Sequence, residues 1–238
     1  MQHFLLNNTR NILVLLVFFS LLHFNSKGVT PVSVTFQNRF EKSQLVPGDR
    51  PFKTSNNGII HVKSLKYYIS GIRLFNNTNE VYSERNSYHL IDAENLNSQL
   101  VLLDVPKGLK YTEIVFDLGI DSVTSVSGAY GDDLDPVNGM YWTWNSGYIN
   151  FKMEGDYSTS DDVFISYQYH LGGYQTPFNA IQTIKLKLID NENINIALDL
   201  KKLFDTIDFT TNIKIMSPSN KAVEMCNHIS KCFYIISE

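Results

Sequence analysis

The amino-acid sequence predicts an all-β protein, a single antiparallel domain of the β-sandwich type with a short C-terminal helix. Most apolar segments are short and alternate apolar with polar residues, and Asn, Gly, Asp and Ser separate them. A period of two with such separators is typical of antiparallel strands. The chain has 238 residues, of which 43% are apolar and 18% charged, and this composition suffices for a full hydrophobic core.

The elements follow one another at short intervals. The expected strands are 32–36, 60–75, 88–93, 100–105, 111–120, 163–171, 183–189, 194–200 and 212–216. A helix is expected at 222–233, and "LKKLFD" at 200–205 could form one short helical turn. The long polar segment 122–139 separates two of these strands, and such loops on β scaffolds commonly carry function.

The N-terminus predicts export. Arg10 precedes "ILVLLVFFSLLHF", an apolar run of the length of a signal-peptide core and too short for a typical membrane span. Ser26 and Gly28 would stand at −3 and −1 of a cut after Gly28. We therefore expect a signal peptide at 1–28 and a mature domain at 29–238, located in the periplasm or at the cell surface. The alternative is an uncleaved N-terminal anchor. No integral membrane domain is expected in the mature chain.

Charge and cysteine usage exclude other classes of protein. The net charge is −4, from 20 basic and 24 acidic residues without a basic cluster, so no nucleic-acid partner is expected. Cys226 and Cys232 are six apart on the predicted helix and point to different faces. A disulfide between them is therefore not expected, and two buried thiols are expected.

No motif indicates an enzyme. The sequence lacks GxSxG, HExxH and a Gly-rich phosphate loop. Asp132, Asp133 and Asp135 do not have the spacing of an EF-hand, so a solvated turn fixed by Pro136 and Gly139 is the favoured interpretation. Paired carboxylates cannot be assigned roles without geometry, so a glycosidase stays open at this point without a motif to support it.

The stretch "GMYWTWNSGYINFKMEG" at 139–155 holds both tryptophans of the chain. If it is extended, Met140, Trp142 and Trp144 point to one face. Three interpretations stay open at this stage. The residues could form a core ridge, or an aromatic platform on an exported sandwich that binds a glycan or a protein without metal. With a histidine from another strand they could form a Cu(I) site, because thioether and imidazole suit Cu(I).

The segment "FDLGIDS…GAYGDDLDPVNGMYWTWNSGYINFKMEG" resembles the copper-binding methanobactin-partner (MbnP-like) family, particularly its members outside methanobactin operons. The likeness runs from about residue 32 to the C-terminus through "LKYYISGIRL", "YHLIDA", "YHLGGY" and "IMSPSNKAVEMCNHISKCF". The resemblance implies an exported protein that binds one copper ion as Cu(I) and is a binder and an enzyme's substrate, not a catalyst. It also implies that a partner dihaem enzyme of the cytochrome c peroxidase/MauG superfamily oxidises the first tryptophan of W-x-W to kynurenine.

Carried over by motif position, Trp142 is the modified residue and Trp144 its unmodified neighbour. Met140 precedes Trp142 by two residues and is the first choice for the sulfur ligand. His170, in "HLGG", is the first choice for the imidazole ligand.

The sequence also offers two reserve ligands, and at one point it differs from some members of the family. His89 and Met216 are the reserve candidates for the imidazole and the sulfur. Some relatives carry a histidine in the loop that here is "SVTSVSGAYGDD", which has none. If that histidine is the ligand in those relatives, copper binding here would be weak or absent. His61 and His228 are expected to be structural.

Overall fold

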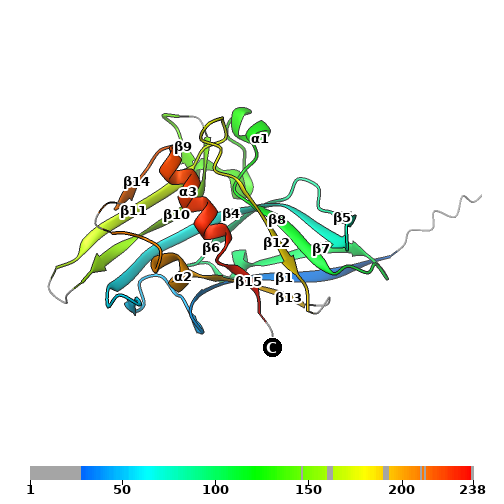
Figure 1. The fold of residues 1–238 in the computed structure, drawn as a ribbon. Coiled ribbons are helices and arrows are strands. Elements are labelled where there is room, and N and C mark those ends of the chain that lie inside the picture. The colour runs from blue at the N-terminus through cyan, green and yellow to red at the C-terminus, as the bar shows by residue number, and fades with distance from the viewer. Residues whose placement is uncertain are drawn as a thin grey trace, which may run out of the picture.

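The structure is a computed structural model that describes residues 28–145, 147–159, 163–189, 193–209, 211 and 213–236 (Figure 1). The predicted signal peptide, except for Gly28, lies outside the described residues. Within the described part of the chain, no helix combines the length and apolar character needed to cross a membrane. Strands dominate, as predicted.

The predicted strands form, with bounds that differ by a few residues. The strands are β1 (Val29–Phe40), β2 (Ser43–Gln44), β3 (Phe52–Lys53), β4 (Ile59–Asn76), β5 (Asn79–Ser83), β6 (Tyr88–Asp92), β7 (Leu100–Pro106), β8 (Glu113–Leu118), β9 (Tyr141–Trp142), β10 (Gly147–Ser158), β11 (Ile165–Gly172), β12 (Gln182–Lys187), β13 (Asn193–Asp199), β14 (Lys214–Ile215) and β15 (Phe233–Ile235). The helical elements are α1 (Ser122–Val126), α2 (Leu200–Phe204), α3 (Asn220–Ser230) and the 3-10 turns η1 (Leu96–Gln99), η2 (Asp132–Leu134) and η3 (Pro136–Asn138).

The strands form two sheets. The larger one has the order β12-β8-β4-β10-β11-β14, with β3, β5 and β6 added along β4 and β9 added to β10. The smaller one has the order β15-β13-β1-β2, with β7 also paired to β1. Most pairs are antiparallel, as expected, but β1 pairs with β13 and β11 with β14 in parallel. Parallel partners need a long crossover, and these pairs are distant enough in the chain to allow one.

The main core lies between the two sheets and under α2 and α3. The central strand β4 contributes Tyr67 and Ile69, and β1 contributes Phe36, whose ring meets Phe116 edge-on at 5.5 Å. The predicted C-terminal helix is confirmed as α3, which begins where the Ser219 hydroxyl accepts a hydrogen bond from the Ala222 N–H at 3.2 Å. Such a cap satisfies one of the unpaired N–H groups of the first turn.

Cys226 and Cys232 are free and buried, as predicted. Burial raises the pKa of both thiols to about 12. Both cysteines therefore stay protonated at neutral pH and act as small apolar side chains.

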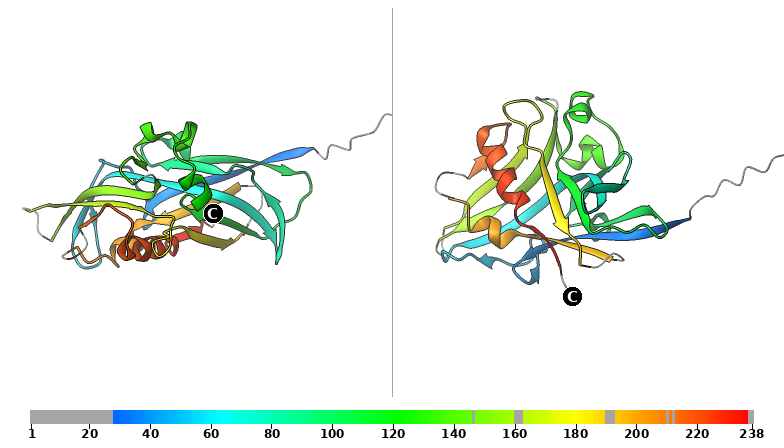
Figure 2. Two further views of the ribbon diagram at one scale, coloured as in Figure 1. Left: turned by 90° about the horizontal axis from the view of Figure 1, so that it is seen from above. Right: turned by 45° about the vertical axis from the view of Figure 1, so that its right-hand side comes forward.

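A second, smaller core covers the opposite face of the large sheet. We call it the outer core; its buried members are Tyr68, Leu90, Ile120, Leu134, Met140, Trp142, Tyr148 and Ile149. Figure 2 shows α1 and the adjoining loops on one side of the large sheet and α2 and α3 on the other. The loop that leads into the W-x-W motif is thus packed on the sheet and is not a free surface loop.

Candidate functional site

The segment between β8 and β9 is tied to the sheet through backbone groups. The Tyr68 hydroxyl donates to the carbonyl oxygen of Asp133 at 2.8 Å, and the Asp133 carboxylate accepts from the Leu90 N–H at 3.0 Å. The Tyr148 hydroxyl donates to the Leu134 carbonyl at 3.1 Å. Burial raises the pKa of Tyr68 and Tyr148, so both phenols stay protonated and able to donate these bonds.

Of the acidic residues of this loop, Asp135 caps a turn, as expected, whereas Asp133 binds the backbone of β6. Asp135 accepts from the Val137 N–H at 2.9 Å and so caps η3, which ends at Gly139 with a positive φ of 70°. Among the described residues, no group of three or more His, Cys, Asp or Glu side chains is arranged to hold a metal ion.

The W-x-W motif is only partly extended. Strand β9 ends at Trp142, and a turn follows immediately. Met140 and Trp142 are buried, with 0% and 5% of their surface exposed, whereas Trp144 is 65% exposed. The expectation that Met140, Trp142 and Trp144 share one face is therefore wrong for Trp144, because the turn redirects it to solvent. The two indole rings remain neighbours, with centroids 5.9 Å apart.

The buried indole lies over a glycine of β11. A Cβ atom placed on Gly172 would come within 2.9 Å of Cζ3 and 3.0 Å of Cη2 of Trp142. Tyr169 and Leu171 of the same strand belong to the main core, so His170 and Gly172 point to the opposite face. Residues two apart on a strand are separated by about 7 Å. His170 and the Trp142 ring are thus on the same face, at neighbouring positions.

The His170 ring is held by a carboxylate. Its Nε2 lies 2.6 Å from Oε1 of Glu154, and only 13% of the His170 side chain is exposed. Lys152, which stands opposite His170 in the β10–β11 ladder, has its Nζ 4.0 Å from the same Oε1. Lys152 Nζ also donates to the Gly139 carbonyl at 3.4 Å, next to Met140. Glu154 and Lys152 thereby connect His170 to the loop that carries the W-x-W motif.

The two reserve candidates lie in different places. Met216 directly follows β14, and the register Tyr169↔Ile215 puts it next to His170 in the parallel pair. Because Ile215 faces the main core, Met216 is on the His170 face, and it is 41% exposed. His89 is paired with Ile69, a main-core residue, and paired residues share a face of the sheet. His89 is therefore on the main-core face, whereas His170 is on the outer face.

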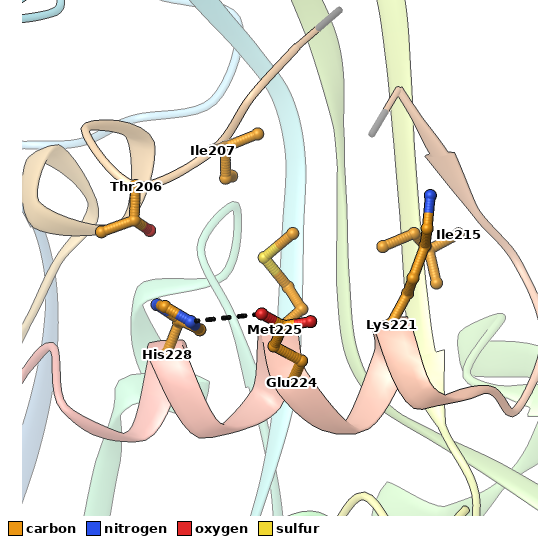
Figure 3. A pocket seen from close by; sticks show the side chains of 7 residues that line it. All are labelled: Thr206, Ile207, Ile215, Lys221, Glu224, Met225 and His228. Carbon is orange, nitrogen blue, oxygen red and sulfur yellow. Dashed lines mark ion pairs between the residues drawn. The ribbon is translucent and has the colours of Figure 1, made fainter. Parts of the chain in front are cut away.

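A pocket of about 80 Å³ lies where α3 packs near β14, away from the W-x-W motif (Figure 3). It is lined by Thr206, Ile207, Ile215, Lys221, Glu224, Met225 and His228. Figure 3 shows Met225 rising from α3 toward Ile207, with the His228–Glu224 ion pair, 4.0 Å long, beside it. Ile215 faces this pocket and Met216 faces the other way, so the large sheet separates it from Trp142.

The donors near Trp142 have one chemistry in common. An imidazole from His170 and thioethers from Met140 and Met216 are uncharged, and all three residues lie on the outer face of the large sheet. Such donors fit Cu(I) and do not fit Mg²⁺ or Ca²⁺, which prefer oxygen ligands. Sequence reasoning missed Gly172, Glu154 and Lys152, whose roles depend on the pairing of distant strands.

Comparisons with known proteins agree with this fold. The family model MbnP matches residues 29–221. The solved structure of MbnP from Methylosinus trichosporium is similar, with a TM-score of 0.54 and 17% sequence identity, over 82% of this chain and 87% of that chain. At this identity the likeness concerns the fold alone. No curated protein sequence matches significantly.

Proposed function

The chain belongs to the MbnP family, and from that premise we propose that it is an exported copper-binding protein holding one Cu(I) beside a modified Trp142. It acts as a binder and as the substrate of a partner enzyme, not as a catalyst. The observation that carries the proposal is the position of the buried Trp142 ring, which rests on Gly172 two residues from His170 on the same face.

His170 and Met140 are the proposed ligands, with Met216 as a further sulfur. The imidazole and thioether donors leave the charge of Cu(I) unchanged and favour it over hard divalent cations. Met140 is fully buried in the outer core, which keeps water from its sulfur. Met216 approaches from the open side, because it follows the edge strand β14. A modified Trp142 would then form one wall of the site.

The modification requires a partner, which we propose to be a dihaem enzyme of the cytochrome c peroxidase/MauG type. Kynurenine formation is an oxidation, and the enzyme would need O2 or a peroxide as oxidant. Two oxygen atoms add to C2 and C3 of the indole as the C2–C3 bond breaks, and one water then hydrolyses the formyl group and releases C2 as formate. Trp142 is too buried for direct contact with another protein, whereas the exposed Trp144 lies 5.9 Å from it. Electrons would therefore leave Trp142 through Trp144.

A hollow of about 350 Å³ beside this turn gives the partner a surface to contact. Its lining includes Asn145, Tyr174, Phe178 and Pro218. Aromatic side chains are enriched at protein–protein interfaces. The lining also includes the polar residues Gln175 and Thr176, so together with Trp144 it forms a mixed aromatic and polar surface next to the proposed exit point of the electrons.

The alternative function, an aromatic platform for a glycan or a protein without metal, has less support. Such a platform needs several exposed rings, but Trp142 and Tyr148 are buried and Tyr141 is half-buried. Trp144 is the exposed ring of the motif, so a stack of four rings is not available to a sugar.

The test is mass spectrometry of the protein purified from its native host, together with its copper content. We expect an N-terminus at Val29, bound copper, and a peptide containing Trp142 that is heavier by about 4 Da, the mass change of tryptophan-to-kynurenine conversion. Unmodified Trp142 without copper, in copper-replete cells, would overturn the proposal. Trp142→Phe should abolish high-affinity copper binding while the fold is retained, and unchanged affinity would contradict the role of this residue.

A further inference from the structure

We propose that Glu154 is a positioning residue that fixes His170 as the Nε2–H tautomer, so that Nδ1 is the nitrogen that binds copper. The inference rests on the proposed function and deepens it, because it names the ligating atom and the group that selects it. It follows from a single contact, the 2.6 Å separation of His170 Nε2 and Glu154 Oε1.

The chemistry of the two groups sets the direction of this hydrogen bond. An ionised carboxylate can only accept, so the imidazole nitrogen that faces it must carry the hydrogen. A neutral imidazole has one N–H, and its other nitrogen then presents a lone pair. Since Nε2 is committed to Glu154, the lone pair is on Nδ1. Histidines that bind metals usually donate their second nitrogen to such a partner, which fixes the ring and raises the basicity of the ligand.

The location of Glu154 makes it suited to this role. Lys152 of β10 stands opposite His170 of β11, so the two side chains are on the same face of the sheet. Glu154 is two residues further along β10 and therefore shares that face. The His170 side chain is mostly buried, which limits competition from water for the contact. Lys152 joins the Glu154 carboxylate to the Gly139 carbonyl, so the ring and the Met140 loop share one network.

The molecule contains a matched comparison on the other face of the same sheet. His89 Nε2 lies 2.9 Å from Oε2 of Glu84, which is also a partly buried histidine–glutamate pair. Burial raises the pKa of Glu84, but hydrogen bonds from His89 and Ser87 outweigh it and hold the pKa below its usual value. This pair is on the main-core side and has no part in the proposed copper site, so it reports what a purely structural pair does.

The experiment compares Glu154→Ala, Glu154→Gln and Glu84→Ala with the wild type. Nitrogen-15 NMR of histidine-labelled, metal-free protein reads each tautomer, and competition with a Cu(I) chelator reads affinity on protein carrying the modification. We expect Nε2–H on His170 in the wild type, and a mixture of the two tautomers in Glu154→Gln, whose amide can accept from Nε2–H or donate to a bare Nε2. Glu154→Ala should release the tautomer and weaken Cu(I) binding about 10–100-fold. Glu84→Ala should leave Cu(I) affinity unchanged.

Three results would overturn the inference: Nδ1–H on His170 in the metal-free wild type, wild-type affinity in Glu154→Ala, or equal losses in Glu154→Ala and Glu84→Ala. Glu154 is partly exposed, and Glu154→Gln keeps its shape, so one variant remains informative if the alanine form folds poorly. Failure of the modified wild type to bind Cu(I) would instead overturn the proposed function. The tautomer of the metal-free protein would then still decide whether Glu154 orients the ring.

Discussion

Replacing Gly172 by alanine should destabilise the protein and displace the Trp142 ring. An added Cβ would lie 2.5 Å from the backbone oxygen of Tyr148 and about 3 Å from two ring atoms of Trp142. Real Cβ atoms essentially never come that close to other heavy atoms. The Tyr148 oxygen belongs to the neighbouring strand and the indole is packed in the outer core, so neither can give way without disturbing other contacts.

The cost is that of overpacking, about 1–3 kcal/mol. For a chain of this size, 1 kcal/mol corresponds to a change in Tm of about 2–4 °C, so a cost of about 2 kcal/mol lowers Tm by about 4–8 °C. The matched control is Gly131→Ala, where the added Cβ meets no heavy atom within 4 Å and φ is −92°. That change should alter the free energy of unfolding by less than about 0.5 kcal/mol.

The assay combines thermal unfolding with selectively excited tryptophan fluorescence in a Trp144→Phe background, where Trp142 is the single tryptophan. Because Trp142 is buried, its emission should be blue-shifted in the parent and should move to the red in Gly172→Ala. Copper affinity should fall as well, since the ring forms a wall of the proposed site. Equal Tm values for the two glycine variants, or an unchanged emission maximum, would refute the packing of Trp142 against Gly172.

Further predictions concern the ligands, the electron path and pH. Met140→Leu and Met216→Leu should each weaken Cu(I) binding in a chelator competition. The stability cost for the buried Met140 should stay below about 1.5 kcal/mol, because leucine and methionine have similar volumes. Unchanged Cu(I) affinity in either variant would show that its sulfur is not a ligand. Trp144→Phe should slow the partner-dependent gain in mass without lowering Tm, because Trp144 is exposed; an unchanged rate would exclude it from the electron path. Burial raises the pKa of Asp121, but hydrogen bonds from Tyr88 and the start of α1 outweigh this and lower it below its usual value. The contribution of the Asp121 carboxylate to stability is therefore complete above its unfolded-state pKa and is lost as pH falls through its folded-state pKa. Asp121→Asn should accordingly make the free energy of unfolding depend less on pH in the acid range. Identical stability–pH curves for the two proteins would contradict this prediction.

Much of the fold could be predicted because a strand that is buried on one face alternates apolar and polar residues in its sequence. Strand β1 alternates buried and partly exposed residues along most of its length, and its period of two is visible in the letters. Strand β10 was not predicted, because its first half is buried on both faces, between the main core and the outer core. A strand covered on both sides loses the alternation from which strands are recognised.

The exposure of Trp144 could not be inferred from the W-x-W spacing. Period-two reasoning assumes that a strand continues, but β9 ends at Trp142 after two residues. The antiparallel register Trp142↔Gly147 shows that the chain reverses between β9 and β10, and residues 143–145 form a turn. Trp144 is the middle residue of that turn. The motif therefore contains one buried and one exposed indole, and the symmetric W-x-W pattern gives no sign of this difference.

The remaining parts of the site depend on strand pairing across long distances in the chain. "HLGG" signals a close approach at its glycines, but the sequence does not say which side chain approaches Gly172. The link from His170 to Glu154 likewise appears only when β10 and β11 are paired in register. The residues that would hold copper were thus accessible through motif resemblance, whereas those that orient them were accessible only through the fold. Copper affinity should accordingly depend on residues such as Glu154 and Gly172, which supply no ligand atom but fix the position of the ring beside them.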